Sequence, residues 1–368
     1  MLDTPPSDHD PWEHRDFSLA LALSGGNALG AYQAGAYQAL QEHALEPDRI
    51  AGASAGAING AIICGNLPER RITSLKALWT PAPAHSSPQP GNVLEEARRT
   101  GAAAWTLAAG RPDLFVPRSP FGQWWNPFGN PEPSSLYDST PMRRTLQRLI
   151  DFELLNQGMP RFSATAVDLE TGDDVVFDTS SHRIEADHLR ASAALLPAFS
   201  PVEIGGRLLG DAGLSANLPL DGLLSETHDR PLLCIAIDLL PLRAPRPRTL
   251  GETVIRMQDL LFATQSRRAI AAWQALFDER VRNGATASVT LLHIAYSDHA
   301  REVSGKAFDF SPASAAARWR KGAADLNNVL ERLASGAIRL GKPGLSVHAF
   351  ASDGQVEEVH WALTPLRA

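Results

Sequence analysis

Two short stretches decide the fold of this chain: LALSGGNALG at residues 21–30 and IAGASAGA at residues 50–57. Each begins as an apolar run, passes through a turn that contains glycine and continues into small residues. A continuous apolar run that ends in glycines is typical of a buried strand in a parallel sheet, and a helix of small residues can pack closely on it. We therefore predict strands over 18–24 and 49–53, helices over 30–44 and 55–64, and an α/β fold.

The composition is that of a globular protein. Apolar residues make up 44% and charged residues 20% of the 368 residues, which excludes a disordered or fibrous chain. The net charge of -7, from 34 basic and 41 acidic residues, argues against nucleic-acid binding. Residues 1–17 lack the basic and apolar segments of a signal peptide, and no uncharged apolar run of about 18 residues follows. We expect a cytoplasmic protein, although export without a signal peptide stays open.

Later segments continue the α/β pattern around one region of different composition. Residues 81–140 are rich in proline, glycine and aromatic residues, which indicates an insertion or lid. Elsewhere the spacing predicts a hairpin over 161–178, a central strand over 231–240, a further strand over 287–294, and helices over 93–109, 140–149 and 315–333. A long helix ends near residue 283, and its stripe of Met257, Leu261, Ile270, Trp273 and Phe277 is expected in the core.

The segment from Gly52 to Gly56 matches the Gly-x-Ser-x-Gly nucleophile elbow, with Ser54 at its centre. In this motif the glycines allow a sharp turn between strand and helix that exposes the serine hydroxyl. The helix N-terminus also offers free N–H groups to an oxyanion. Because the pattern alone is weak, its position between a predicted strand and a predicted helix is the argument for Ser54 as a nucleophile. The alternative is a turn of small residues packed against the sheet.

The glycine loop, residues 25–30, admits three interpretations. A dinucleotide fingerprint needs glycine where Asn27 stands, and a phosphate-binding Walker loop needs Lys and Ser or Thr where Ala31 and Tyr32 follow. Both nucleotide interpretations therefore fail on named residues. The third is an oxyanion hole formed by the backbone N–H groups of Gly25, Gly26 and Asn27, which fits the nearby serine.

A nucleophilic serine needs a base, and histidine is the usual one. None of the candidate histidines, His188, His228, His293 and His299, stands in a supporting motif. Asp211, in the Gly-Asp-Ala-Gly turn at 210–213, follows an apolar segment and is the stronger candidate. An ordinary turn aspartate is the alternative.

Together these motifs resemble the patatin-like phospholipase family. They comprise the glycine loop followed by AYQAG at 31–35, the GASAG elbow, the ASA segment at 191–193 with FSPV at 199–202, and Asp-x-Gly at 211–213. The resemblance spans about residues 17–240, which it implies to be the catalytic domain. Residues 81–140 are expected to be an insertion or lid within this domain. Residues 250–368 are expected to form a C-terminal extension that packs on the same domain. The resemblance further implies a three-layer α/β/α fold with a mainly parallel sheet.

The resemblance also implies a chemistry. Ser54 would be the nucleophile and Asp211 the base of a dyad without histidine, and the N–H groups of Gly25, Gly26, Asn27 and Ala55 would form the oxyanion hole. The substrate would be an acyl ester of a lipid, cleaved through an acyl-enzyme. No cofactor or metal is expected, since the sequence has no metal-binding motif.

Several alternatives stay open at this point. The same dyad could act on other esters or thioesters, and a protein of this fold could bind lipid without catalysis, because fold does not fix function. Asn27 and Leu29 depart from the family's usual loop residues. Phe115, Trp124 and Trp125 are candidates for an acyl pocket or for contact with a membrane surface.

Overall fold

The computed structural model describes residues 15–80, 93–118, 135–226, 229–297, 302–303, 305–350 and 356–361. A ten-stranded sheet has the order β12-β11-β10-β9-β1-β2-β5-β8-β7, and β6 pairs with β5. The strands are β1 Ser18–Leu23, β2 Arg49–Ala53, β5 Arg161–Asp168, β6 Asp174–Asp178, β7 Val202–Ile204, β8 Arg207–Asp211, β9 Leu232–Asp238, β10 Ser288–Ala295, β11 Gly344–Phe350 and β12 Val356–Glu358. The six strands from β11 to β5 are parallel, and β12, β6, β8 and β7 join them in antiparallel pairs. A separate pair is formed by β3 Val116–Pro117 and β4 Tyr137–Asp138.

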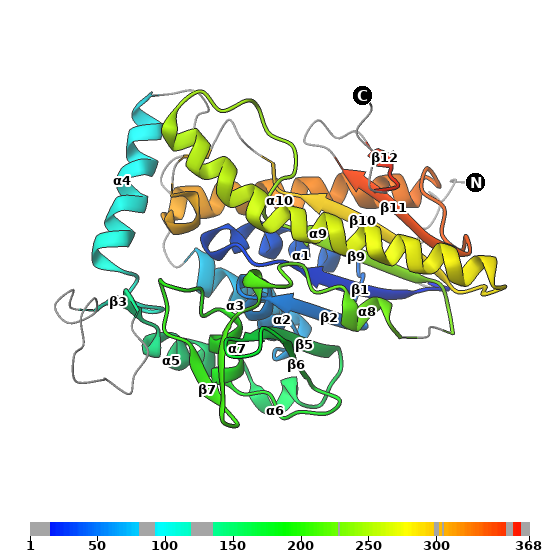
Figure 1. The fold of residues 1–368 in the computed structure, drawn as a ribbon, viewed down its shortest axis with the longest axis horizontal. Coiled ribbons are helices and arrows are strands. Elements are labelled where there is room, and N and C mark those ends of the chain that lie inside the picture. The colour runs from blue at the N-terminus through cyan, green and yellow to red at the C-terminus, as the bar shows by residue number, and fades with distance from the viewer. Residues whose placement is uncertain are drawn as a thin grey trace, which may run out of the picture.

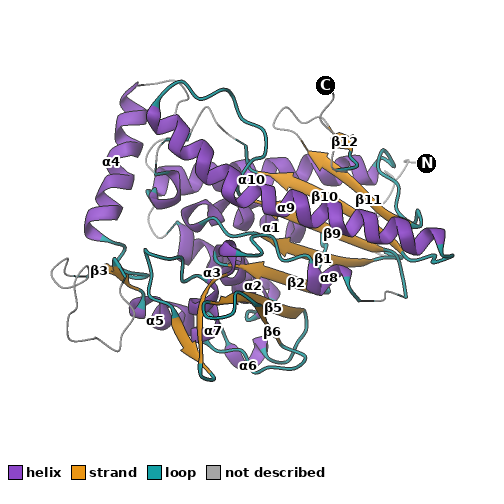
Figure 2. Cartoon of the chain, viewed as in Figure 1, coloured by secondary structure: helices purple, strands orange, loops and turns teal. Residues whose placement is uncertain are grey.

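Helices cover both faces of the sheet (Figures 1 and 2). The helices are α1 Ala31–Glu42, α2 Ala55–Cys64, α3 Pro68–Trp79, α4 Val93–Ala109, α5 Thr140–Leu149, α6 Phe152–Leu155, α7 Ala186–Ser192, α8 Asp221–Leu224, α9 Leu250–Arg282 and α10 Pro312–Ala334, with 3₁₀ turns η1 Asn27–Gly30, η2 Ala212–Leu214 and η4 Lys306–Phe308. In Figure 1, α9 crosses in front of the strands, α1 and α10 lie behind them, and α4 stands at the left edge.

The side chains of β1 contribute to the hydrophobic cores on both faces of the sheet, which accounts for the three layers. Side chains of this strand alternate between the two faces of the sheet, as in any strand. Leu19, Leu21 and Leu23 belong to the core beneath α1, α2 and α10. Ala20 and Ala22 face the second core, to which α9 contributes Ile270 and Phe277. The predicted α/β/α architecture is therefore confirmed.

Most predicted elements are present, with boundaries shifted by a few residues. The strand predicted at 231–240 is β9, which lies inside the sheet between β1 and β10. The stripe on α9 is only partly in the core: Ile270 and Phe277 are buried, but Met257 and Leu261 are more than half exposed. That part of the prediction is wrong, because helical spacing does not reveal how far along a 33-residue helix the sheet extends.

The C-terminal part of the chain continues the same sheet. Strand β10 pairs in parallel with β9, and β11 pairs in parallel with β10. The C-terminal helix α10 packs on α1. The two helices cross so closely that a Cβ atom on Gly322 would lie 1.9 Å from the carbonyl oxygen of Tyr32. The proposed boundary between 17–240 and 250–368 therefore falls between neighbouring strands.

Candidate active site

Ser54 lies in the sharp turn between β2 and α2. Its φ of 53° falls in the left-handed region that non-glycine residues seldom adopt. The flanking glycines permit the turn: a Cβ on Gly52 would lie 2.5 Å from the Ala57 nitrogen, and one on Gly56 would lie 2.1 Å from the Leu23 carbonyl oxygen. The local geometry is therefore that of a nucleophile elbow.

A second motif fixes the backbone of this turn. The N–H of Ser54 donates a hydrogen bond to Oγ of Ser192 at 3.0 Å. Ser192, the last residue of α7, is fully buried. The ASA segment at 191–193 therefore contacts the elbow directly, and Ser192 is a site residue whose contact the sequence does not reveal.

Asp211 is the last residue of β8 and is only 3% exposed. One carboxylate oxygen accepts a hydrogen bond from the N–H of Gly213 at 2.6 Å, and the side chain of Ser54 lies close enough to lower the pKa of the carboxyl group. Burial raises the pKa of Asp211 to about 6, although Ser54 and the hydrogen bond from Gly213 act in the opposite direction. The structure thus brings together two residues that are more than 150 positions apart in the sequence.

The glycine loop lies beside Ser54, but its N–H groups are not equivalent. The N–H of Gly25 already donates to the carbonyl oxygen of Asn217 at 3.1 Å, so the prediction of Gly25 as an oxyanion donor is wrong. In the described part of the chain, the N–H groups of Gly26, Asn27 and Ala55 have no hydrogen-bond partner. Asn27 has a φ of 51°, a conformation that asparagine tolerates better than most residues. Three free donors therefore remain near the serine.

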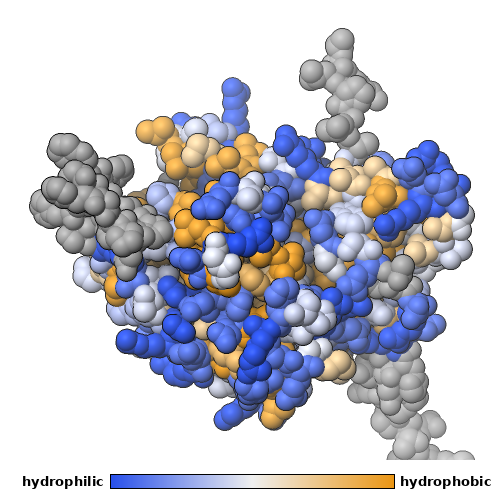
Figure 3. Space-filling view, turned by 60° about the horizontal axis from the view of Figure 1, so that its bottom comes forward, coloured by the Kyte–Doolittle hydropathy of each residue, from blue (hydrophilic) through white to orange (hydrophobic). Residues whose placement is uncertain are grey.

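These residues line one apolar pocket, called here the Ser54 pocket, of about 860 Å³ including its open part. Besides Ser54, Asp211 and the loop residues, its wall contains mainly hydrophobic side chains: Ile58, Leu78, Trp79, Leu114, Phe115, Met142, Leu195, Phe199, Leu240, Phe262, Phe308 and Phe310. Phe115, one of the candidates for an acyl pocket, lines the Ser54 pocket, whereas Trp124 and Trp125 lie outside the described residues. In the space-filling view, hydrophobic residues gather near the middle of one face among hydrophilic ones (Figure 3).

Part of the pocket wall could not be foreseen from the sequence. Phe262 comes from α9, and Phe308 and Phe310 come from the segment before α10. Phe310 stacks on Trp79 with ring centroids 6.4 Å apart, and Phe115 contacts Phe199 edge-on at 5.1 Å. The residues beyond 245 carry no recognisable motif, so only their packing reveals this contribution.

No histidine of the described residues lines the pocket. His188 caps α7 and packs edge-on against Phe177, and His293 lies 3.4 Å from Asp238. His228 and His299 lie outside the described residues. Both cysteines are buried, and burial raises the pKa of Cys64 and Cys234, so neither thiol is an activated nucleophile.

Comparison with known families agrees with this geometry. The sequence model described as "Patatin-like phospholipase" matches residues 21–224, more than half of the chain and the whole span from the glycine loop to α8. The chain belongs to the patatin-like phospholipase family. A second model, described as "Patatin phospholipase", matches residues 257–337, for which the sequence analysis finds no resemblance.

Individual patatin-like relatives are more distant. Uncharacterized NTE family proteins of Mycobacterium bovis and Mycobacterium tuberculosis are each 27% identical over 219 residues, which cover 59% of this chain and 30% of the relative. The chain therefore matches less than a third of the length of these relatives. Among solved structures, VipD from Legionella pneumophila has a TM-score of 0.42 at 14% identity, over 86% of this chain and 67% of VipD. Human GIVD cytosolic phospholipase A2 has a TM-score of 0.31 at 13% identity, over 60% of this chain and 43% of that one.

Two further features of this patatin-like chain bear on its chemistry. Among the residues that the structure describes, no group of three His, Cys, Asp or Glu side chains could hold a metal ion. In the same residues, no helix has the length and apolar character needed to cross a bilayer.

Proposed function

We propose that this chain is a serine acyl hydrolase that cleaves acyl esters of lipids with a Ser54–Asp211 dyad. One observation carries the proposal: a serine on a strained elbow and a buried carboxylate that it influences lie together in the lining of one apolar pocket. Family membership supports the lipid substrate class.

The reaction would proceed in two steps. Oγ of Ser54 attacks the ester carbonyl carbon while its proton passes to the Asp211 carboxylate, and the N–H groups of Gly26, Asn27 and Ala55 stabilise the oxyanion. The ester bond then breaks, and the leaving alcohol takes the proton from Asp211. Water attacks the acyl-enzyme, gives a proton to Asp211 and releases the fatty acid; Ser54 recovers its proton from Asp211. Each oxyanion donor would contribute roughly 3 kcal/mol.

The pocket wall favours an acyl chain as the bound group. It is lined mainly by aliphatic and aromatic side chains, and its polar side chains are those of Asn27, Ser54, Asp211, Asn217 and Gln258. Burial of one methylene contributes about 0.8 kcal/mol, or roughly a fourfold gain in kcat/KM. We expect kcat/KM to rise by up to this factor per methylene until the pocket is filled.

The test measures hydrolysis of p-nitrophenyl esters of increasing chain length, and of phosphatidylcholine vesicles, by the wild type, Ser54→Ala and Asp211→Asn. The wild type should cleave esters and react with a fluorophosphonate probe, and both variants should lose at least 1,000-fold in kcat. An exposed aspartate variant, Asp113→Asn, serves as the control and should retain full activity.

Three results would contradict parts of the proposal. If the correctly folded wild type neither hydrolyses esters nor reacts with the fluorophosphonate probe, the protein is not a hydrolase, and lipid binding without catalysis becomes the favoured function. Full activity of Asp211→Asn would remove the dyad. Cleavage of p-nitrophenyl esters without any cleavage of phosphatidylcholine would move the substrate class to small acyl esters.

A further inference from the structure

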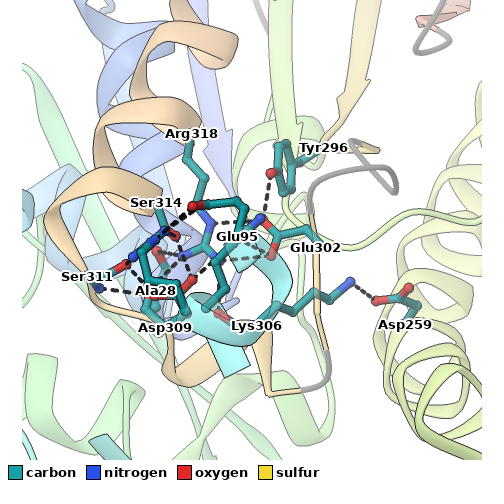
Figure 4. Close-up of polar contacts among 12 residues, drawn as sticks. Ala28, Glu95, Asp259, Tyr296, Glu302, Lys306, Asp309, Ser311, Ser314 and Arg318 are labelled. Carbon is teal, nitrogen blue, oxygen red and sulfur yellow. Dashed lines mark hydrogen bonds and ion pairs between the residues drawn. The ribbon is translucent and has the colours of Figure 1, made fainter. Parts of the chain in front are cut away.

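A buried ionic cluster lies against the back of the glycine loop. It consists of Arg99 from α4, Glu302 and Asp309 from the segment before α10, and Arg318 from α10, and is called here the Arg318 cluster (Figure 4). Arg99 lies 2.8 Å from Glu302 and 3.0 Å from Asp309, and Arg318 lies 2.9 Å from Glu302. All four side chains are at most 6% exposed. Three members of the cluster lie C-terminal to residues 21–224, the region that matches the family model, and Arg318 connects them to the glycine loop near the start of that region.

Arg318 uses its whole guanidinium. Nε and Nη2 donate to the two carboxylate oxygens of Glu302, each at 2.9 Å. The remaining donors reach three backbone carbonyl oxygens, those of Asp309 at 2.8 Å, Lys306 at 3.1 Å and Ala28 at 3.1 Å. Only the planar fork of arginine can satisfy a carboxylate and several carbonyls in this arrangement.

The contact with Ala28 places this cation next to the free donors of the glycine loop. Ala28 follows Gly26 and Asn27 directly, and its carbonyl is held by a side chain 290 positions away. On the other side of the same donors, the Gly25 N–H is held by the carbonyl of Asn217. The two free N–H groups therefore lie between two long-range anchors, in a turn where Asn27 adopts a positive φ.

The cluster favours the charged forms of Glu302, Asp309 and Arg318. Burial alone would raise the pKa of Glu302 and of Asp309, but Arg318 and Arg99 hold both below their ordinary values. The pKa of Arg318 is raised by Glu302 against the effect of burial. A buried ion cluster is seldom more stabilising than apolar side chains of the same volume. Its presence here therefore suits a positional role better than a purely stabilising one.

We propose that Arg318 is a positioning residue that holds the glycine loop in the conformation in which the Gly26 and Asn27 N–H groups face the oxyanion. The proposal rests on the proposed acyl hydrolase function. It assigns a role in that reaction to the C-terminal region, and in particular to α10. Arg318 does not touch the reacting atoms; it acts through the Ala28 carbonyl.

The test compares Arg318→Lys with Arg99→Lys. Both replacements keep the charge in the same buried cluster, but only Arg318 contacts the glycine loop, so Arg99→Lys is the matched control. The substrate is p-nitrophenyl acetate, whose acyl group is too short to report on the pocket wall. We expect Arg318→Lys to lower kcat at least tenfold and to change KM less than threefold. Arg99→Lys should keep kcat within threefold of the wild type, although it should lower Tm about as much as Arg318→Lys does.

Hydrogen–deuterium exchange of the peptide that spans residues 24–32 is the second readout, and it does not depend on catalysis. Exchange should be faster in Arg318→Lys than in Arg99→Lys and the wild type. If Arg318→Lys does not fold, Glu302→Gln replaces it in both measurements, with the same expectations. Equal effects of the two lysine variants on kcat and on exchange would overturn the proposal. An inactive wild type whose loop still exchanges faster in Arg318→Lys would refute only the hydrolase function.

Discussion

At the residue scale, the environment of Asp211 decides its chemistry. An exposed aspartate is almost fully ionised well below neutral pH, whereas burial moves the pKa of Asp211 to about 6. A carboxylate with this pKa is a stronger base than an ordinary aspartate and is still ionised at pH 7. The turn at Gly213 keeps one of its oxygens hydrogen-bonded, so the carboxylate has a fixed orientation toward Ser54.

The raised pKa predicts a pH-dependent stability cost. The folded protein binds the Asp211 proton more tightly than the unfolded chain, so the free energy of unfolding falls as pH rises from about 4 to about 6. A shift of this size corresponds to about 3 kcal/mol above pH 6. Asp211→Asn removes the buried charge and keeps an acceptor for Gly213, so it should raise Tm at pH 8 and leave it nearly unchanged at pH 4.

Thermal unfolding at both pH values checks this expectation. Asp113→Asn, at an exposed carboxyl, should change Tm little at either pH. A lower Tm of Asp211→Asn than of the wild type at pH 8 would contradict the view that burial of this charge is destabilising.

At the element scale, the close crossing of α1 and α10 positions Arg318. A Cβ on Gly35 of α1 would lie 1.9 Å from the carbonyl oxygen of Trp319, and one on Gly322 of α10 would lie 1.9 Å from that of Tyr32. The backbones of the two helices are therefore in contact over several residues. Since Trp319 is the neighbour of Arg318, any separation of the helices would also move the guanidinium away from the glycine loop.

Alanine at Gly35 should separate the two helices. Overpacking of a core typically costs 1–3 kcal/mol, and more is expected where the added atom meets backbone that cannot yield, so Gly35→Ala should lower the free energy of unfolding by at least about 3 kcal/mol. The matched control is Gly101→Ala on α4, where a Cβ would have no neighbour within 4 Å. Gly101→Ala should stabilise the protein by up to about 1 kcal/mol through helix propensity. Urea unfolding of both variants measures the difference; equal stabilities would refute the tight crossing.

At the scale of the whole molecule, the part of the chain beyond residue 245 belongs to the site as well as to the fold. Strands β10 and β11 extend the sheet, α10 covers α1, and Phe262, Phe308 and Phe310 complete the pocket wall. Strand β9 is buried along its entire length, and β10 pairs with one of its edges.

A chain that ends after Arg243 is therefore not expected to fold. Truncation exposes the edge of β9 and the apolar face of α1, and such surfaces promote aggregation. The truncated chain should be insoluble or lack a cooperative thermal transition by circular dichroism, in contrast to the full chain. A soluble fragment that melts cooperatively within a few degrees of the full chain would mean that residues 250–368 are separable from the sheet.

Local sequence patterns are enough to predict the two strand–turn–helix units, the elbow at Ser54 and Asp211 as a candidate base. These features depend on steric rules that operate within a few residues: glycine where the backbone turns sharply, and small side chains where helix and strand touch. Three further features are visible only in the folded chain: Gly25 is not a free donor, Asp211 is buried beside Ser54, and Arg318 contacts the glycine loop. Each of these is a contact between segments far apart in the chain, which forms because the whole core packs together and leaves no local trace in the sequence.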